Sequence, residues 1–239
     1  MQVLRCVSRI ILSFNPFTVQ VIAHRITMRR LPVYLVLDVS GSMSGEPIEA
    51  VKNGMQLLHS SLRKDPYALE SAYISVITFA SEVQQIIPLT ELSQFQPPNL
   101  SAGGGTSLGG ALQKVTDCAS SEVKKGTREE KGDWKPLVFF MTDGSPTDNV
   151  ESGLQAFLNY RWGIVVACAA GSGADTSVLQ RITENVVTLD TADSTTIAAF
   201  FKWVSSSIST SSKKVEETGS DAGGSELPPP PPEINLAKP

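Results

Sequence analysis

Short apolar segments of strand length alternate along this chain with segments whose apolar residues recur at helical spacing. Residues 33–39 are apolar except for Asp38, which is typical of a strand buried on both faces. The next segment starts at Glu46-Pro47, and proline suits the first turn of a helix. One face of that helix carries Ile48, Val51, Met55, Leu58 and Leu62. Because strands separated by helices form βαβ crossovers, we predict an α/β fold with a mostly parallel sheet.

The alternation continues to residue 209. Residues 83–89 are the expected edge strand, because Pro88 lacks the N–H that a central strand donates. We therefore expect three α/β/α layers, in which helices cover both faces of a sheet with one antiparallel edge strand. The predicted strands are residues 33–39, 72–79, 83–89, 137–141, 163–169 and 186–189, and the predicted helices are residues 46–62, 108–115, 154–158, 178–182 and 195–209.

Length and composition favour one folded domain with two tails. The chain has 239 residues, 41% of them hydrophobic, which suffices for one core. Residues 1–30 hold five arginines and no acidic residue, and the sequence from Met28 resembles a natural protein start. Residues 1–27 are therefore expected to be an N-terminal extension outside the fold, and residues 28–209 to form the domain.

The C-terminal residues 210–239 are expected to be a disordered, Pro-rich tail. They consist largely of Ser, Lys, Glu, Gly and Pro, which bury too little apolar area to offset the entropy of ordering. The run Pro228–Pro232 favours an extended polyproline II spacer.

Charge and cysteine content exclude several classes of protein. The formal net charge of −4 argues against a nucleic-acid binder, which usually carries a basic face. The longest apolar run near the start, residues 7–14, is far below the roughly 20 residues of a membrane span. Cys6, Cys118 and Cys168 lack metal-ligand spacing, and the last two lie in apolar segments. Cys118 and Cys168 are expected to be reduced core residues, which fits a reducing compartment.

Three polar clusters follow predicted strand ends or precede a predicted helix. Asp38, Ser40 and Ser42 alternate directly after the first strand, Thr106 follows a triple glycine, and Asp143 ends the strand at 137–141. In open α/β sheets, ligands bind beyond the carboxyl ends of the strands. Each cluster alone is typical of a turn or a helix cap. Together, two carboxylates and three hydroxyls form a hard oxygen set that suits Mg²⁺, Mn²⁺ or Ca²⁺.

The number of candidate ligands points to binding rather than catalysis. Octahedral Mg²⁺ takes about six oxygens, and the five side chains supply fewer. A cation with an open position invites an external anion, most simply an Asp or Glu of a protein partner.

The run Asp38-Val39-Ser40-Gly41-Ser42 resembles the DxSxS signature of von Willebrand factor A domains. Thr106 and Asp143 match the threonine and aspartate that complete the metal-ion-dependent adhesion site (MIDAS) of that family. The resemblance covers about residues 32–209 and implies a Rossmann-like sheet with the site at its top. It also implies direct metal ligation by the serines and the threonine, with the aspartates acting partly through water.

Residues 28–55 are similar to the start of bacterial tellurium-resistance TerY-type proteins. That resemblance implies a cytoplasmic protein of a tellurite-resistance or stress-response system, with kinase-like and phosphatase proteins as neighbours. Some relatives carry a cysteine-rich module at the C-terminus, whereas this chain has a Pro-rich segment there.

Several enzyme classes fit the sequence less well than a metal-dependent protein-interaction module. A haloacid-dehalogenase-type phosphohydrolase also places an aspartate after its first strand, but it needs a second acid where Ser40 stands. A P-loop would need Gly-Lys-Ser/Thr after the triple glycine. A Ser/His/Asp hydrolase lacks a histidine, because His24 lies in the extension and His59 is expected on the solvated side of its helix. We therefore predict no enzyme activity, and the phosphohydrolase is the alternative.

Overall fold

The computed structural model of the chain describes residues 29–224 and 227–237, so the predicted extension at residues 1–27 lies outside the described residues. In the described part, seven strands form one sheet in the order β3-β2-β1-β4-β5-β6-β7. The mostly parallel α/β sheet that the sequence predicts is confirmed. The strands are β1 Leu31–Asp38, β2 Ala72–Phe79, β3 Val83–Glu91, β4 Leu137–Thr142, β5 Ile164–Ala170, β6 Val186–Leu189 and β7 Asn235–Leu236.

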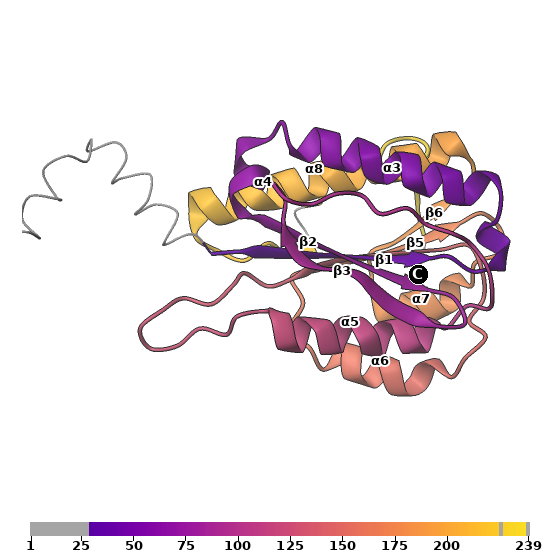
Figure 1. Cartoon of the computed structure of the whole chain (residues 1–239), viewed down its shortest axis with the longest axis horizontal. Helices are drawn as coiled ribbons and strands as arrows, with labels where there is room; N and C mark the ends of the chain where they lie inside the picture. The colour runs from indigo at the N-terminus through magenta and orange to yellow at the C-terminus, as the bar shows by residue number, and fades with distance from the viewer. Residues whose placement is uncertain (1–28, 225–226, 238–239) are drawn as a thin grey trace, which may run out of the picture.

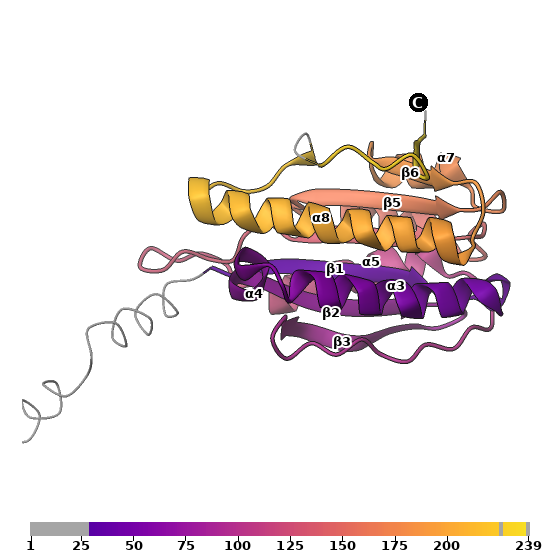
Figure 2. The same cartoon turned by 90° about the horizontal axis from the view of Figure 1, so that it is seen from above.

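Helices cover both faces of the sheet, as predicted (Figure 1). The helices α3, α4 and α8 lie on one face, and α5, α6 and α7 lie on the other, an arrangement that Figure 2 shows from above. Two separate hydrophobic clusters fill the space between the sheet and these two layers. The helices are η2 Gly41–Met43, α3 Glu46–Leu62, α4 Pro66–Ser71, α5 Leu108–Glu122, α6 Val150–Leu158, α7 Thr176–Ile182 and α8 Ser194–Thr218.

Strand β1 lies in the interior of the sheet and is buried along its whole length. It pairs in parallel with β2 on one side and with β4 on the other. The strand order therefore changes direction between β1 and β4, and a crevice opens beyond the carboxyl ends of such a pair. Asp38 ends β1, and Asp143 directly follows β4.

The edges of the sheet are formed by β3 and β7. Strand β3 pairs antiparallel with β2, as expected for a strand that contains Pro88. Strand β7 pairs antiparallel with β6 and covers the edge that β6 would otherwise expose. The sequence predicted the first antiparallel edge strand and missed the second.

The C-terminal segment differs from the expected disordered tail. Helix α8 continues to Thr218, beyond the predicted boundary at residue 209, and ends at Gly219 with a φ of 65°. The following chain packs on the domain: Ala222 and Ile234 are buried, and Trp203 Nε1 donates a hydrogen bond of 2.8 Å to the Pro228 carbonyl. Ala222 and Ile234 of this segment fill sites on the domain, so the average composition of the segment is a poor guide.

His59 is also placed differently from the prediction. Its side chain is only 9% exposed and meets the Phe95 ring edge-on, with ring centroids 5.7 Å apart. The segment that follows β3 covers this face of α3, so the helix has no solvated side at His59. By contrast, Cys118 and Cys168 are free and buried, as predicted, and burial raises the pKa of both thiols.

Helix α8, although 25 residues long, is too polar to cross a lipid bilayer, and no other helix of the described residues could do so.

Candidate functional site

Asp38 is fully buried at the carboxyl end of β1, and two hydrogen bonds fix its carboxylate. The Ser40 backbone N–H donates to Asp38 Oδ1 at 2.7 Å, and the Thr142 hydroxyl donates to Asp38 Oδ2 at 2.5 Å. Thr142 is the last residue of β4, so the bond joins the ends of the two central strands. Thr142 was not among the predicted site residues, because it precedes Asp143 at the end of the predicted buried strand and resembles an ordinary strand or turn threonine.

Ser40, Ser42 and Asp143 form a continuous row of oxygen atoms beside Asp38. The Oγ atoms of Ser40 and Ser42 are 3.0 Å apart, and Ser42 Oγ donates to Asp143 Oδ1 at 2.7 Å. Ser40 is buried, whereas Ser42 is exposed and Asp143 is half-buried. The row therefore leads from the buried end of β1 to the surface.

Thr106 is buried just before α5 and is held by residues of the loop that follows β4. The Thr106 backbone N–H donates to Thr147 Oγ1 at 2.9 Å, and the Thr147 N–H donates back to the Thr106 carbonyl at 2.9 Å. A Cβ built on Gly144 would lie 3.6 Å from Thr106 Oγ1 and 3.7 Å from Ser42 Oγ. The Thr106 hydroxyl thus faces the same point as the serine row, and all five predicted side chains meet at one edge of the sheet.

The triple glycine before Thr106 lets its loop approach the loop after β1. The Gly41 N–H donates to the Gly104 carbonyl at 2.9 Å, and Gly104 has a φ of 84°, which favours glycine. Gly105 N–H donates to the Ser81 hydroxyl at 2.8 Å. Ser81 is a further positioning residue that the sequence did not reveal, since a single serine in a turn carries no distinctive pattern.

Thr147 and Asp148 connect the loop that follows β4 to the residues at the start of α5. The Asp148 carboxylate accepts the N–H groups of Gly109 and Gly110 at 3.1 and 2.9 Å, so it caps the first turn of α5. Together, Thr147 and Asp148 tie the start of α5 to the loop that contains Asp143.

The site brings the carboxylates of Asp38 and Asp143 together in a partly buried position. Burial raises the pKa of Asp38, and the nearby Asp143 carboxylate raises it further, while the hydrogen bonds from Ser40 and Thr142 act in the opposite direction. Two adjacent carboxylates with no cationic partner in the hydrogen bonds and ion pairs of the described residues favour a positively charged ligand. In the described part of the chain, no three His, Cys, Asp or Glu side chains gather where they could hold a metal. A cation held at this edge would therefore need the hydroxyls as ligands in addition to the two carboxylates.

The spacing of the oxygens fits a small divalent cation. In an octahedron with metal–oxygen distances of about 2.1 Å, adjacent ligand atoms lie about 3.0 Å apart. The two steps of the row, 3.0 Å and 2.7 Å, are close to that spacing. The donor set of hydroxyls and carboxylates also matches the preference of hard cations for oxygen.

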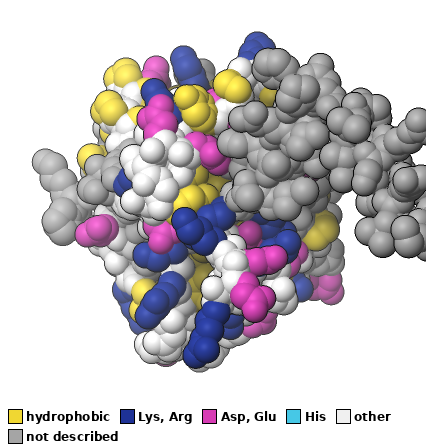
Figure 3. All heavy atoms as spheres, turned by 90° about the vertical axis from the view of Figure 1, so that its left-hand side faces the viewer, with side chains coloured by type: hydrophobic (Ala, Val, Ile, Leu, Met, Phe, Trp, Pro, Cys, Tyr) yellow, Lys and Arg dark blue, Asp and Glu magenta, His cyan; other side chains and the backbone are white. Residues whose placement is uncertain are grey.

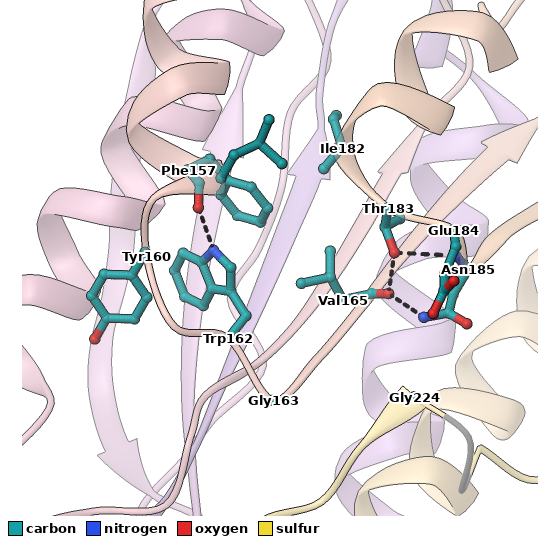
Figure 4. Close-up of a pocket in the computed structure, with 11 residues that line it drawn as sticks. Phe157, Tyr160, Trp162, Gly163, Val165, Ile182, Thr183, Glu184, Asn185 and Gly224 are labelled. Atoms are coloured by element: carbon teal, nitrogen blue, oxygen red, sulfur yellow. Dashed lines mark hydrogen bonds between the residues drawn. The ribbon is translucent and has the colours of Figure 1, made fainter.

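A pocket of about 290 Å³ lies at the opposite end of the sheet, where β5 begins (Figure 4). Its polar groups bond to neighbouring backbone: Trp162 Nε1 donates to the Phe157 carbonyl, and Thr183 and Asn185 donate to the Val165 carbonyl. The Trp162 ring also stacks on Phe157, with centroids 4.7 Å apart. Because the polar side chains of this pocket already bond to the neighbouring backbone, the pocket is a weaker candidate for a functional site than the carboxyl edge of the sheet.

Comparison with protein families gives a match over most of the fold. The model of the von Willebrand factor type A domain family matches residues 33–202. The chain is 26% identical to the human (Homo sapiens) inter-alpha-trypsin inhibitor heavy chain H6 over 172 residues, which are 66% of this chain and 13% of that protein. The chain thus spans only a small part of this curated relative.

Solved structures show the same fold. The structure titled von Willebrand factor type A from Catenulispora acidiphila has a TM-score of 0.58 at 14% identity, over 76% of this chain and 43% of that one. Proximal thread matrix protein 1 from the mussel byssus, with a zinc-occupied MIDAS motif, has a TM-score of 0.55 at 18% identity, over 76% of this chain and 48% of that one.

Proposed function

The chain belongs to the von Willebrand factor type A domain family, and from this premise we propose that it is a metal-dependent protein-interaction module with a MIDAS-type site. The observation that carries the proposal is the row of oxygens from Ser40 through Ser42 to Asp143, spaced as neighbouring ligands of one cation. Domains of this family bind a divalent cation at such a site, and one similar fold has its MIDAS motif occupied by zinc.

The five residues take different parts in this proposed site. The hydroxyls of Ser40, Ser42 and Thr106 are the direct ligands, and Asp143 supplies a carboxylate beside them. Both oxygens of Asp38 already accept hydrogen bonds, so Asp38 contributes mainly its negative charge and orients Ser40. Mg²⁺ is the proposed ion, with Mn²⁺ and Ca²⁺ as alternatives, because the ligands are hard and carry few charges.

A partner completes the proposed site. Five protein side chains leave at least one coordination position for an external oxygen, and a carboxylate of an Asp or Glu supplies both the oxygen and the charge. The histidine and the cysteines of the described residues do not reach the site: His59 is buried on α3, and Cys118 and Cys168 are buried in the core. We therefore assign binding and no catalysis.

The biological setting is a finer proposal that rests on the resemblance of residues 28–55 alone. It makes the chain a scaffold in a bacterial tellurite-resistance or stress-response system, in the cytoplasm, with kinase-like or phosphatase proteins as partners. The reduced, buried cysteines agree with such a compartment.

Isothermal titration with Mg²⁺ and Mn²⁺ tests the metal site. The Asp38→Ala, Ser40→Ala double variant should bind either ion at least about 100-fold more weakly than the wild type. A matched control exists in Asp175→Ala, Ser177→Ala, which removes another Asp-x-Ser pair, the cap of α7, from the same edge of the sheet. This control should bind the ions as the wild type does; equal weakening in both variants would defeat the proposed site.

The same pair of variants tests partner binding. A bacterial partner retained by the wild type in Mg²⁺ should be lost in EDTA and lost with the Asp38→Ala, Ser40→Ala variant. The control changes one surrounding carboxylate and no candidate ligand, so it should still retain the partner. Identical retention by all three proteins would show that the site is not the binding surface.

The alternative, a Mg²⁺-dependent phosphohydrolase of the haloacid-dehalogenase type, gains no support from the site geometry. Ser40 occupies the position of the second acid, and its hydroxyl bonds to Ser42. Turnover of a generic phosphate ester that disappears in Asp38→Asn would revive this alternative.

A further inference from the structure

The face around the proposed metal site carries acidic side chains and no basic ones. The segments that connect the elements at this carboxyl edge are residues 39–45, 80–82, 101–107, 143–149, 171–175 and 190–193, and they contain no lysine or arginine. The acidic residues in or next to these segments are Asp38, Glu46, Glu82, Asp143, Asp148, Asp175, Asp190 and Asp193. Several of them cap helices, which explains their position. However, no lysine or arginine in these segments balances the acidic charge.

This charge restricts the partner that the proposed site accepts. A partner carboxylate is attracted by the cation but repelled by the acidic face around it. Basic side chains next to that carboxylate reverse the repulsion and add specificity, because complementary charges steer association and suppress wrong partners. The matching element is therefore an exposed Asp or Glu that basic residues flank.

The opposite, amino edge of the same molecule has the complementary charge. Its segments, residues 29–30, 63–65, 123–136, 159–163, 183–185 and 219–224, contain ten basic and six acidic residues. The basic residues are Arg29, Arg30, Arg63, Lys64, Lys124, Lys125, Arg128, Lys131, Lys135 and Arg161. Figure 3 views this side and shows lysine and arginine side chains gathered there, with acidic side chains among them.

One loop of the amino edge presents carboxylates in this setting. Residues 124–131 are all exposed, and their loop projects from the domain at the left of Figure 1, away from the metal-site edge. Glu129 and Glu130 lie between Arg128 and Lys131, with Lys124 and Lys125 nearby in the sequence. No other connection at either edge combines adjacent carboxylates with flanking basic residues on both sides in the described sequence.

Hydrogen bonds order this loop before any partner arrives. At its tip, the Thr127 N–H donates to the Glu130 carbonyl at 2.8 Å, and Thr127 Oγ1 accepts the N–H groups of Glu129 and Glu130 at 3.3 and 3.1 Å. At its base, the Asp133 N–H donates to the Lys124 carbonyl at 2.9 Å, and Asp133 forms an ion pair with Arg30. An ordered loop loses less entropy on binding than a flexible one.

Resting on the proposed function, we propose that the partner completing the metal site is a second copy of this chain. Glu129 or Glu130 of the 124–131 loop enters the site of the next molecule, and the basic side chains of the loop face its acidic rim. The contact joins different surfaces of the two copies, so repetition gives head-to-tail chains or rings. A single loop buries little area, so the association should be weak and should require the divalent cation.

Sedimentation velocity over a range of protein concentrations in Mg²⁺ or Mn²⁺, and in EDTA, tests the inference. The wild type should self-associate only with metal, and less so as salt rises. The Glu129→Gln, Glu130→Gln double variant should stay monomeric while binding the ion with unchanged affinity in isothermal titration. The matched control, Glu216→Gln, Glu217→Gln, changes the same charge near the end of α8 and should associate as the wild type does.

A mixing experiment tests the direction of the contact. The Asp38→Ala, Ser40→Ala variant retains the loop, and the Glu129→Gln, Glu130→Gln variant retains the site. Each alone should be monomeric, and an equal mixture should form a 1:1 dimer and nothing larger. A wild type that binds the ion but stays monomeric at every concentration overturns this inference and leaves the proposed function standing. Failure to bind the ion overturns both.

Discussion

The two ends of the sheet are built differently. At the carboxyl edge, residues of three short motifs contact one another directly, through bonds such as Ser42 to Asp143 and Thr142 to Asp38. At the amino edge, segments without a motif are joined by contacts such as the Arg30–Asp133 ion pair and the hydrogen bond from the Arg30 guanidinium to the Glu122 carbonyl. The candidate site at the carboxyl edge is therefore visible in short sequence motifs, whereas the contacts at the amino edge become apparent only once the chain has folded.

The largest expected effect concerns the C-terminal segment. Ile234 is 4% exposed, so Ile234→Asp should lower the free energy of unfolding by about 3 kcal/mol, because it buries a charge and removes apolar contacts. Leu236→Asp, two residues along the same segment and 62% exposed, should change it by less than about 0.5 kcal/mol. Urea denaturation measures both. Equal effects would mean that the segment does not anchor the domain.

A second prediction concerns the ion pair below the 124–131 loop. The Asp133 side chain is 4% exposed and accepts hydrogen bonds from Arg30 and from the Lys124 N–H. Asp133→Asn leaves the Arg30 charge unpaired and should cost about 2 kcal/mol in urea denaturation. Metal affinity should stay unchanged, because the carboxyl edge is distant from this pair. A large loss of metal affinity would break the distinction between the two ends.

A smaller effect on stability, but a specific one on binding, is expected at the carboxyl edge. Thr147→Val removes the acceptor of the Thr106 N–H and should cost about 1 kcal/mol in the free energy of unfolding. It should also weaken Mg²⁺ binding about 10-fold in isothermal titration, because Thr106 loses its support. The exposed neighbour Ser145, changed to Ala, is the control and should alter neither quantity. Unchanged metal affinity in Thr147→Val would show that Thr106 needs no such support.

The sequence predicted the elements of the sheet well, because buried parallel strands and amphipathic helices leave strong local patterns. The predicted strands at 72–79 and 186–189 coincide with β2 and β6. Helix α4 was not predicted, since its six residues are too few for a periodic pattern, although Asp65 caps it and Pro66 starts it. Strand β7 was missed because its two residues belong to a strand only through their pairing with β6.

The candidate site was predictable for a related reason. Its five side chains follow strand ends or start a helix, and the parallel topology brings these places together. Their supports were less visible. Ser81 and Thr142 act through single bonds to residues far away in the sequence, and no local pattern distinguishes them from an ordinary turn serine or a strand threonine.

His59 was assigned to the wrong face because the predicted apolar stripe on α3 was too narrow. Position 59 lies four residues after Met55 and next to Leu58, so it borders the stripe. Both α8 and the segment containing Phe95 pack against α3. Together they bury a wider face of α3 than a single neighbouring helix would. The width of a buried face depends on what packs against it, which periodicity alone does not show.

The last prediction is a pH dependence that belongs to the amino edge. Burial lowers the pKa of His59 below its ordinary value of 6.5, with a further contribution from the Arg63 charge, and Nε2 has no hydrogen-bond partner among the described residues. The unfolded chain therefore takes up a proton at a higher pH than the folded chain does. The contribution of His59 to stability is present above about pH 6.5 and falls as the pH drops below it.

Urea denaturation of the wild type tests this: relative to pH 7.5, the free energy of unfolding at pH 5.5 should fall by at most about 1.4 kcal/mol more than that of His59→Leu, which lacks the titrating group. Because the described carboxyl edge contains no histidine, His59→Leu should leave the pH dependence of metal binding unchanged. Equal pH dependence of stability in the wild type and in His59→Leu would place the acid sensitivity elsewhere.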